Sequence, residues 1–292
     1  MLHYSYPIYR PPAEADNIIL QITHGCSHNN CTFCTMYKVK SYTVRDQEDI
    51  FADIDILAKH YPDTIKVFLA DGDPLGVDTD YMIEILKYLK FSFKKLRRVS
   101  TYATTSNILS KSPDELKRLY DNNLNLLYLG IETGDDEILN NVNKGVEKND
   151  IIKSIKLVND ANIKISATVI LGLGGKNYTK QHIENTAYII NSTKINYLST
   201  LQLGLEDNIK KRFYNKFEDF EPLDDEAILK EQKELISKIE PLNKIIFRSN
   251  HASNALHLAG TLPKDKERLI GEIDNALENI EQYTIPKIFR GF

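Results

Sequence analysis

Short apolar segments and amphipathic helical segments alternate along most of this chain, and this alternation limits its fold more than any other feature. Runs rich in apolar and β-branched residues predict strands at 17–23, 65–70, 98–101, 125–131, 163–171 and 195–203. Segments with helical periodicity lie between them, at about 46–60, 79–90, 112–122, 148–161 and 179–192. Successive strand and helix units form a parallel sheet through right-handed crossovers. The sequence therefore predicts an α/β fold, a partial (β/α)6 barrel of the TIM type.

The chain changes character after residue 205. Residues 207–225 are charged and aromatic without a clear period, 224–239 and 263–283 have helical periods, and 244–247 predicts a seventh strand. Before the barrel, Pro7, Pro11 and Pro12 predict an extended arm. We therefore expect an N-terminal arm (1–16), a barrel core (17–205) and a mostly helical C-terminal extension (206–292) that packs on or closes the barrel.

Composition and charge exclude several classes of protein. The 42% of hydrophobic and 27% of charged residues are ordinary for a soluble globular protein. A net charge of −4 makes a nucleic-acid partner unlikely, since such proteins usually carry a basic surface. No apolar run approaches the roughly 20 residues of a membrane span, and the N-terminus lacks the pattern of a signal peptide. We expect a cytoplasmic protein without a membrane partner.

All three cysteines, Cys26, Cys31 and Cys34, lie in residues 24–37, the cysteine loop, directly after the first predicted strand. Three thiols clustered in a polar loop do not make a disulfide framework, and this pattern indicates ligands of one metal centre. Three thiolates leave one coordination position without a protein ligand, as chemistry at a metal requires. A zinc site completed by His24 or His28 uses the same cysteines and stays open as an alternative.

The cysteine loop resembles the cluster-binding loop of the radical S-adenosylmethionine (radical SAM) superfamily. It follows a predicted strand near the N-terminus and has an aromatic residue, Phe33, just before the last cysteine. The superfamily usually has C-x3-C-x2-C, whereas this chain has C-x4-C-x2-C, so the first half of the loop must bulge. The resemblance implies a [4Fe-4S] cluster held by three cysteines, with SAM chelating the open iron. It also implies reductive cleavage of SAM to methionine and a 5′-deoxyadenosyl radical.

Two segments after the second and third predicted strands extend the resemblance. Gly72 and Asp73, in D-G-D-P, are similar to the G-G-E-P turn that binds the amino group of SAM, although Asp71 replaces the first glycine and Asp73 the glutamate. Ser106 lies in a stretch of hydroxyl and amide residues that suits the carboxylate of SAM or a substrate. These residues are therefore expected to bind the cofactor.

Two further segments follow the fourth and fifth predicted strands. Glu132, in G-I-E-T-G, resembles a superfamily segment whose carboxylate lies near SAM, and Gly172 and Gly174, in G-L-G-G, resemble the segment that passes under the adenine. The resemblance covers about residues 17–205. Active sites of such barrels lie at the carboxyl ends of the strands, where each of these segments is expected.

Arg248 and His251 follow the seventh predicted strand. An arginine suits a carboxylate or phosphate, and a histidine transfers protons near neutral pH. We expect both to be catalytic residues that act on an anionic or amide-bearing substrate. A hydrogen-bonded loop that closes the barrel is the alternative.

The sequence thus predicts a radical SAM enzyme with one [4Fe-4S] cluster that acts on a small polar or anionic substrate. Such an enzyme needs an electron donor such as a ferredoxin or flavodoxin. No cysteine is left for an auxiliary cluster, which favours hydrogen abstraction, isomerisation or bond cleavage. A zinc-dependent hydrolase or metal-binding barrel, and a non-catalytic iron-sulfur carrier, are the alternatives.

Overall fold

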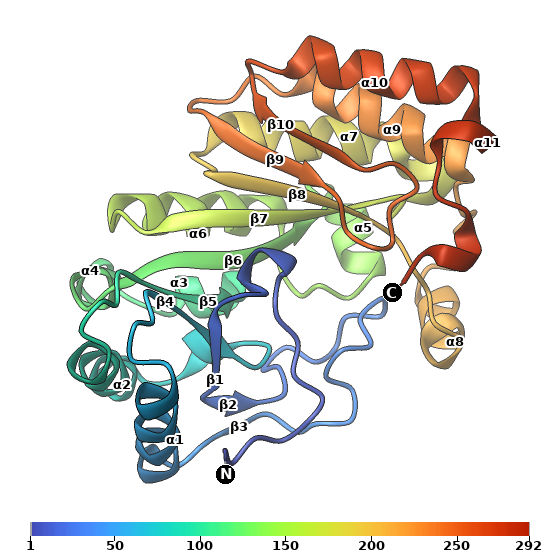
Figure 1. Ribbon diagram of the computed structural model, residues 1–292. Helices are drawn as coiled ribbons and strands as arrows, with labels where there is room; N and C mark the ends of the chain where they lie inside the picture. Colours follow the sequence, from blue (N-terminus) through green and yellow to red (C-terminus); the bar gives the residue numbers. More distant parts are fainter. Residues whose placement is uncertain (1, 292) are drawn as a thin grey trace. The chain divides into compact units, whose positions relative to one another are not determined.

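The computed structural model describes residues 2–291, and Figure 1 labels their helices and strands. The chain divides into two compact units, each with its own strands and buried core. The first unit consists of the chain up to Asn29, Met36–Leu129 and Leu157–Ile165. The second consists of Asn30–Thr35, Gly130–Lys156 and the chain from Ser166 onward. The predicted division into arm, core and extension has other boundaries and stays a prediction.

The strands of the first unit are parallel. Their order is β1 (Ile18–Gln21), β4 (Lys66–Ala70), β5 (Arg98–Ala103) and β6 (Leu124–Glu132, in this unit up to Leu129). Core residues such as Leu20, Phe68 and Leu127 are fully buried, as expected of parallel strands covered on both faces. A short antiparallel pair, β2 (Thr23–His24) and β3 (Thr43–Val44), flanks the segment with the cysteine loop.

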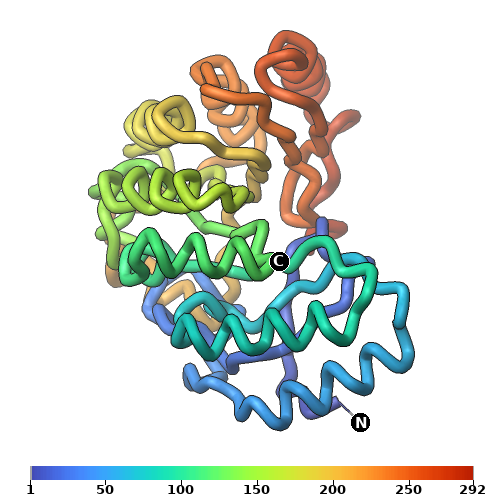
Figure 2. Tube along the Cα trace, turned by 90° about the vertical axis from the view of Figure 1, so that its left-hand side faces the viewer, coloured from blue at the N-terminus to red at the C-terminus, as the bar shows by residue number. Residues whose placement is uncertain are grey.

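The helices of the first unit are α1 (Gln47–His60), α2 (Thr79–Ser92), α3 (Thr105–Leu109) and α4 (Pro113–Asp121), with 3-10 turns η1 (Pro12–Glu14) and η2 (Pro74–Gly76). Three of them, α1, α2 and α4, begin and end close to the predicted limits, whereas the short α3 was not predicted. A capping box begins α4, with both reciprocal hydrogen bonds between Ser112 and Glu115 present. Figure 2 shows α1, α2 and α4 side by side, in agreement with their contacts. The α6 helix (Lys148–Asp160) has residues in both units.

The strands of the second unit are β7 (Lys164–Leu171, in this unit from Ser166), β8 (Tyr197–Gln202), β9 (Ile245–Ser249) and β10 (Leu258–Leu262). The pairs β7/β8 and β8/β9 are parallel, whereas β10 is antiparallel to β9. The predicted seventh strand is confirmed as β9. The sequence did not predict β10, because its short L-A-G-T-L run contains a glycine and has no clear alternation.

The helices of the second unit are α5 (Asp136–Asn141), α7 (Gly175–Ser192), α8 (Asp207–Lys216), α9 (Asp225–Lys238), α10 (Lys266–Glu278) and α11 (Ile280–Tyr283), with the 3-10 turn η3 (Lys287–Phe289). Figure 2 shows α7, α9 and α10 in a row, each in contact with the next. Residues 207–225, which show no clear period in the sequence, contain α8, a helix with only Ile209 and Phe213 buried. No helix in the described part of the chain has the length and apolar character that a membrane span requires.

Candidate functional site

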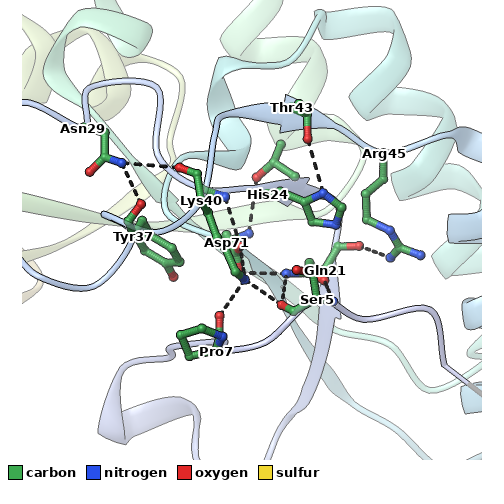
Figure 3. Close-up of polar contacts among 12 residues, drawn as sticks. Ser5, Pro7, Gln21, His24, Asn29, Tyr37, Lys40, Thr43, Arg45 and Asp71 are labelled. Atoms are coloured by element: carbon green, nitrogen blue, oxygen red, sulfur yellow. Dashed lines mark hydrogen bonds and ion pairs between the residues drawn. The ribbon is translucent and has the colours of Figure 1, made fainter.

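The turn after β4 is joined to the start of the cysteine loop by Asp71 (Figure 3). One carboxylate oxygen, Oδ2, accepts hydrogen bonds from the backbone N–H of Gly25 (3.0 Å) and from Nζ of Lys40 (2.9 Å). The other, Oδ1, accepts from Nε2 of Gln21 (3.0 Å). Both side chains of the Lys40–Asp71 ion pair are buried, with 6% and 0% exposed. Asp71 therefore fixes the residue before Cys26 and has a structural role.

The N-terminal arm is part of the same polar network (Figure 3). Nζ of Lys40 donates to the carbonyl oxygens of Ser5 and Pro7, at 2.6 Å each. The Gln21 amide donates to the carbonyl of Ser5 (3.0 Å) and accepts from its N–H (2.8 Å). A buried lysine is tolerated where acceptors take up its N–H donors and an opposite charge balances its own. The arm thus completes the shell that holds Asp71.

The carboxylate of Asp73 is fully buried but only half satisfied. Its Oδ2 accepts hydrogen bonds from Oγ of Ser27, Nδ2 of Asn107 and Oγ1 of Thr104. Its Oδ1 has no hydrogen-bond partner among the described residues. Burial raises the pKa of Asp73 to about 6, against the effect of these hydrogen bonds. A buried acceptor without a donor is costly, so Oδ1 suits a ligand that brings a donor or a positive charge.

Gly72 allows the turn after β4 to approach the cysteine loop closely. Its N–H donates to the carbonyl of Gly25 at 2.9 Å. A Cβ atom at this position would lie 2.7 Å from the ring of Tyr37 and 2.8 Å from Cβ of Cys26. Any side chain here would displace the loop at its first cysteine, so the position requires glycine.

The second half of the cysteine loop is fixed within the second unit. The N–H and Oγ1 of Thr32 donate to the carbonyl of Val142, at 3.0 and 3.3 Å. The carbonyl of Asn30 accepts from Nδ2 of Asn143 (3.1 Å) and from a guanidinium nitrogen of Arg212 (2.6 Å). Segments more than 100 residues away along the chain therefore hold this part of the loop.

Phe33 packs against a hydrophobic cluster of the second unit, formed by Ile138, Val142, Leu173, Phe213, Phe217 and Phe220. Two residues later, Oγ1 of Thr35 donates to the carboxylate of Glu206 at 2.8 Å. The aromatic side chain before the last cysteine is thus an anchor of the loop. Its predicted contact with the cofactor stays a prediction.

Glu132 ends β6 in a strained backbone conformation, with φ of +64°. Its carboxylate accepts a hydrogen bond from Nζ of Lys144 at 2.9 Å, and both side chains are largely buried. Burial opposes the charge of Lys144, but Glu132, Cys31 and Cys34 together raise the pKa of its ammonium group. A Cβ at Gly130 would lie 2.0 Å from Oε1 of Glu132, so glycine is needed for this contact. Strain of this kind is concentrated at functional sites.

The G-L-G-G turn after β7 is held by a carboxylate that sequence reasoning missed. Gly172 has φ of +78° and donates its N–H to Oε1 of Glu231 at 2.6 Å. Glu231, on α9, also accepts a hydrogen bond from Thr179. Gly174 lies at the start of α7, and a Cβ there would be 3.0 Å from Cδ1 of Ile138. Glu231 is 59 residues from Gly172, and no local motif indicates the contact.

Ser106, one of the predicted cofactor residues, is exposed on α3. Its neighbours Thr104 and Asn107 bring their side chains to Asp73 instead. Of this stretch, Thr104 and Asn107 therefore belong to the candidate site. The predicted role of Ser106 stays a prediction.

Arg248 and His251 have local partners at the end of β9. The guanidinium group of Arg248 is exposed and donates to the carbonyls of Phe247 (2.7 Å) and Gly260 (3.4 Å). Nδ1 of His251 accepts from the N–H of Ser253 at 3.2 Å, and burial, with nearby His257, lowers the pKa of His251. These contacts order the loop, and the predicted catalytic roles remain to be tested.

Cys31 is buried, Cys26 and Cys34 are half-buried, and none of the three forms a disulfide. Within residues 2–291 no group of three His, Cys, Asp or Glu side chains has the arrangement of a site for a single metal ion. The assignment of the three cysteines as ligands therefore rests on the sequence.

Comparison with known proteins gives a family match over the predicted barrel. The profile of the radical SAM superfamily matches residues 20–187. The heme chaperone HemW of Bacillus subtilis is 24% identical over 196 residues, which is 66% of this chain and 50% of HemW. The ribosomal protein uS12 methylthiotransferase RimO of Clostridioides difficile is 25% identical over 197 residues, 65% of this chain and 43% of RimO. The chain thus spans about half the length of these relatives, or less.

Two solved structures have a similar fold. Coproporphyrinogen III oxidase (HemN) from Escherichia coli has a TM-score of 0.57 at 16% identity and is aligned over 76% of this chain and 51% of that chain. Methylornithine synthase (PylB) has a TM-score of 0.54 at 15% identity over 93% and 83%. The predicted α/β class, with a mostly parallel sheet like that of partial TIM barrels, is confirmed.

Proposed function

Because this chain belongs to the radical SAM superfamily, whose enzymes use a [4Fe-4S] cluster and SAM, we propose that Cys26, Cys31 and Cys34 hold such a cluster. The protein then cleaves SAM reductively to methionine and a 5′-deoxyadenosyl radical. The radical acts on a small polar or anionic substrate. Cysteines that must stay reduced to bind a cluster suit a reducing compartment, which favours the cytoplasm.

The observation that carries this proposal is the buried carboxylate of Asp73. SAM has a cationic amino group, and Oδ1 of Asp73 is a buried acceptor without a partner among the described residues. The donors on Oδ2 include Ser27, the residue after Cys26. An ammonium group close to the first cysteine would therefore find a fixed acceptor of opposite charge.

The contacts of the cysteines fit thiolate ligands. In the second unit, the ammonium group of Lys144 is close enough to Cys31 and Cys34 for their negative charge to raise its pKa. In the first unit, Gly72 has no side chain that would collide with Cβ of Cys26. A positive charge favours deprotonated thiols, which are the form that binds metals.

For the other predicted cofactor residues we propose roles that depend on the strand or turn in which each lies. Glu132, on its strained strand end, would accept from the ribose hydroxyls or the amino group of SAM. The backbone of Gly172 and Gly174 would contact the adenine, with Glu231 holding the turn in shape. Ser106 and Phe33 would complete the site around the carboxylate and the cluster.

The test is anaerobic reconstitution with iron and sulfide, followed by assay with SAM and dithionite. We expect a brown protein with about four irons per chain and formation of 5′-deoxyadenosine, detected by mass spectrometry. Replacing all three cysteines by serine should abolish both. A colourless protein with one zinc would establish the hydrolase or metal-binding alternative, and a cluster without 5′-deoxyadenosine would establish the carrier.

A further inference from the structure

A basic hollow lies in the second unit, outside the proposed SAM-binding residues. It has a volume of about 640 Å³ and is lined by one face of α8 and by Thr32 of the cysteine loop. Lys211, Arg212 and Lys216 supply its charge, the remaining lining residues are asparagines, and none of the described lining residues is acidic. This is a local positive surface in a protein whose net charge is −4.

The basic residues of α8 are separated from the anchoring residues of the same helix. Ile209 and Phe213 are buried, whereas Lys211, Arg212 and Lys216 are exposed. Arg212 and Lys216 are four residues apart, a spacing at which like charges destabilise a helix. Asp207 does not relieve this repulsion in the hollow, because it pairs with Lys210 at 2.7 Å, outside the lining. A partner of opposite charge would relieve it.

The hollow is in direct contact with the cysteine loop. Thr32, one of its lining residues, lies between Cys31 and Cys34 in the sequence. Arg212 donates to the carbonyl of Asn30 at 2.6 Å. A protein seated on this face of α8 would therefore approach the loop that carries two of the proposed cluster ligands.

The exposure of these cations indicates the kind of partner. A small anion bound to exposed side chains keeps its hydration and is screened by salt, so it gains little. A protein with an acidic face contacts several cations at once, excludes water, and is steered to them during encounter. Each reductive cleavage of SAM in the proposed reaction requires one electron, and a carrier protein that donates single electrons would supply it.

We propose that the basic face of α8, with Thr32, is the docking surface for an acidic one-electron carrier protein of the flavodoxin or ferredoxin class. This inference rests on the proposed function. One electron leaves the reduced carrier, which is oxidised, and enters the cluster, which is reduced. That electron is then consumed in breaking the sulfonium bond of SAM.

The test compares two double variants with equal changes of charge. Lys211→Glu/Lys216→Glu reverses the hollow without touching Arg212 and its contact with the loop. Lys210→Glu/Lys230→Glu is the control, since both lysines are exposed and lie outside the hollow. Each reconstituted protein is assayed for 5′-deoxyadenosine with dithionite, and separately with flavodoxin, its reductase and NADPH.

With dithionite, both variants should match the wild type. With flavodoxin, the hollow variant should lose about tenfold or more in kcat/KM for flavodoxin, mainly through KM, and its salt dependence should be weaker than that of the wild type. The control should keep wild-type values. Equal flavodoxin kinetics in the two variants would overturn the docking surface, and so would an equal loss with both reductants, which would mark α8 as structural.

Direct binding of flavodoxin to the reconstituted proteins separates this inference from the proposed function. If the wild type forms no 5′-deoxyadenosine with either reductant, the proposed function fails on its own. Weaker binding of flavodoxin by the hollow variant alone still supports the surface, and unchanged binding refutes it. Displacement of flavodoxin by an RNA that binds more tightly to the same lysines would also refute it.

Discussion

Replacement of Asp73 by asparagine should convert an acceptor for SAM into a donor while leaving the local fold intact. Three side chains donate to Oδ2, so the amide oxygen of asparagine must take that position. The amide NH2 group is then forced to the position of Oδ1, which has no partner among the described residues. A donor at this point repels the amino group that the carboxylate would bind.

The expected loss follows from the strength of one charge-assisted hydrogen bond. Such a bond contributes roughly 1.5–3 kcal/mol, which corresponds to about a 10- to 150-fold rise in the Kd for SAM. We would measure the Kd by anaerobic titration calorimetry on reconstituted protein, with iron content as a check on the cluster. Asp63→Asn, at an exposed aspartate, is the control. Wild-type affinity in Asp73→Asn would refute the assigned role of this carboxylate.

The same residue predicts how SAM binding depends on pH. Burial raises the pKa of Asp73 to about 6, so below that pH the carboxyl group is neutral and SAM binding must first remove its proton. The Kd should then rise by up to about tenfold per pH unit below 6 in the wild type and stay flat in Asp73→Asn. Since the folded-state pKa is raised from 3.8, this group also makes the cluster-free protein less stable as pH rises from about 4 to 6.

Three further changes test other parts of the structure. Gly72→Ala should abolish cluster incorporation, because its Cβ would lie 2.8 Å from that of Cys26; Gly271→Ala, which meets nothing within 4 Å, should keep the full iron content. Lys40→Met should lower the free energy of unfolding by about 3–5 kcal/mol, as expected when one partner of a buried ion pair is removed, whereas exposed Lys87→Met should change it by less than about 0.5 kcal/mol in urea denaturation. Arg248→Ala should raise the KM for the substrate and leave uncoupled SAM cleavage unchanged; equal loss of both activities would assign Arg248 to the structure of its loop.

The sequence predicted those elements that carry a strong local signal. The capping box at Ser112 fixes the start of α4, and every predicted strand from 17 to 203 is present. The α8 helix was missed because only Ile209 and Phe213 form its apolar stripe, while charges occupy most other positions. Phe213 of this helix packs in a hydrophobic cluster that includes Ile138 and Leu173, which are distant in the sequence, so no single window of sequence displays the packing that stabilises α8.

In the candidate site, too, the residues that lie in a local motif could be predicted and those that act through distant contacts could not. Gly72 and Asp73 could be found because they lie in a short motif at a strand end. Lys144 and Glu231 could not, since each acts through a contact with a partner distant in the sequence, 12 and 59 residues away. Thr104 was close to the predicted Ser106, but only the turn of α3 decides which hydroxyl reaches Asp73.

The long first gap of the cysteine motif has a physical explanation in the partners of its polar residues. Oγ of Ser27 donates to Asp73, and Nδ2 of Asn29 donates to the carbonyl of Tyr37 at 2.6 Å, both within the first unit. The carbonyl of Asn30 accepts from Arg212 within the second unit, and the boundary between the units falls between Asn29 and Asn30. The gap therefore has one set of anchors in each unit. Three of its four residues, Ser27, Asn29 and Asn30, thus have an anchoring contact of their own, so the extra residue belongs to the way this chain holds its loop.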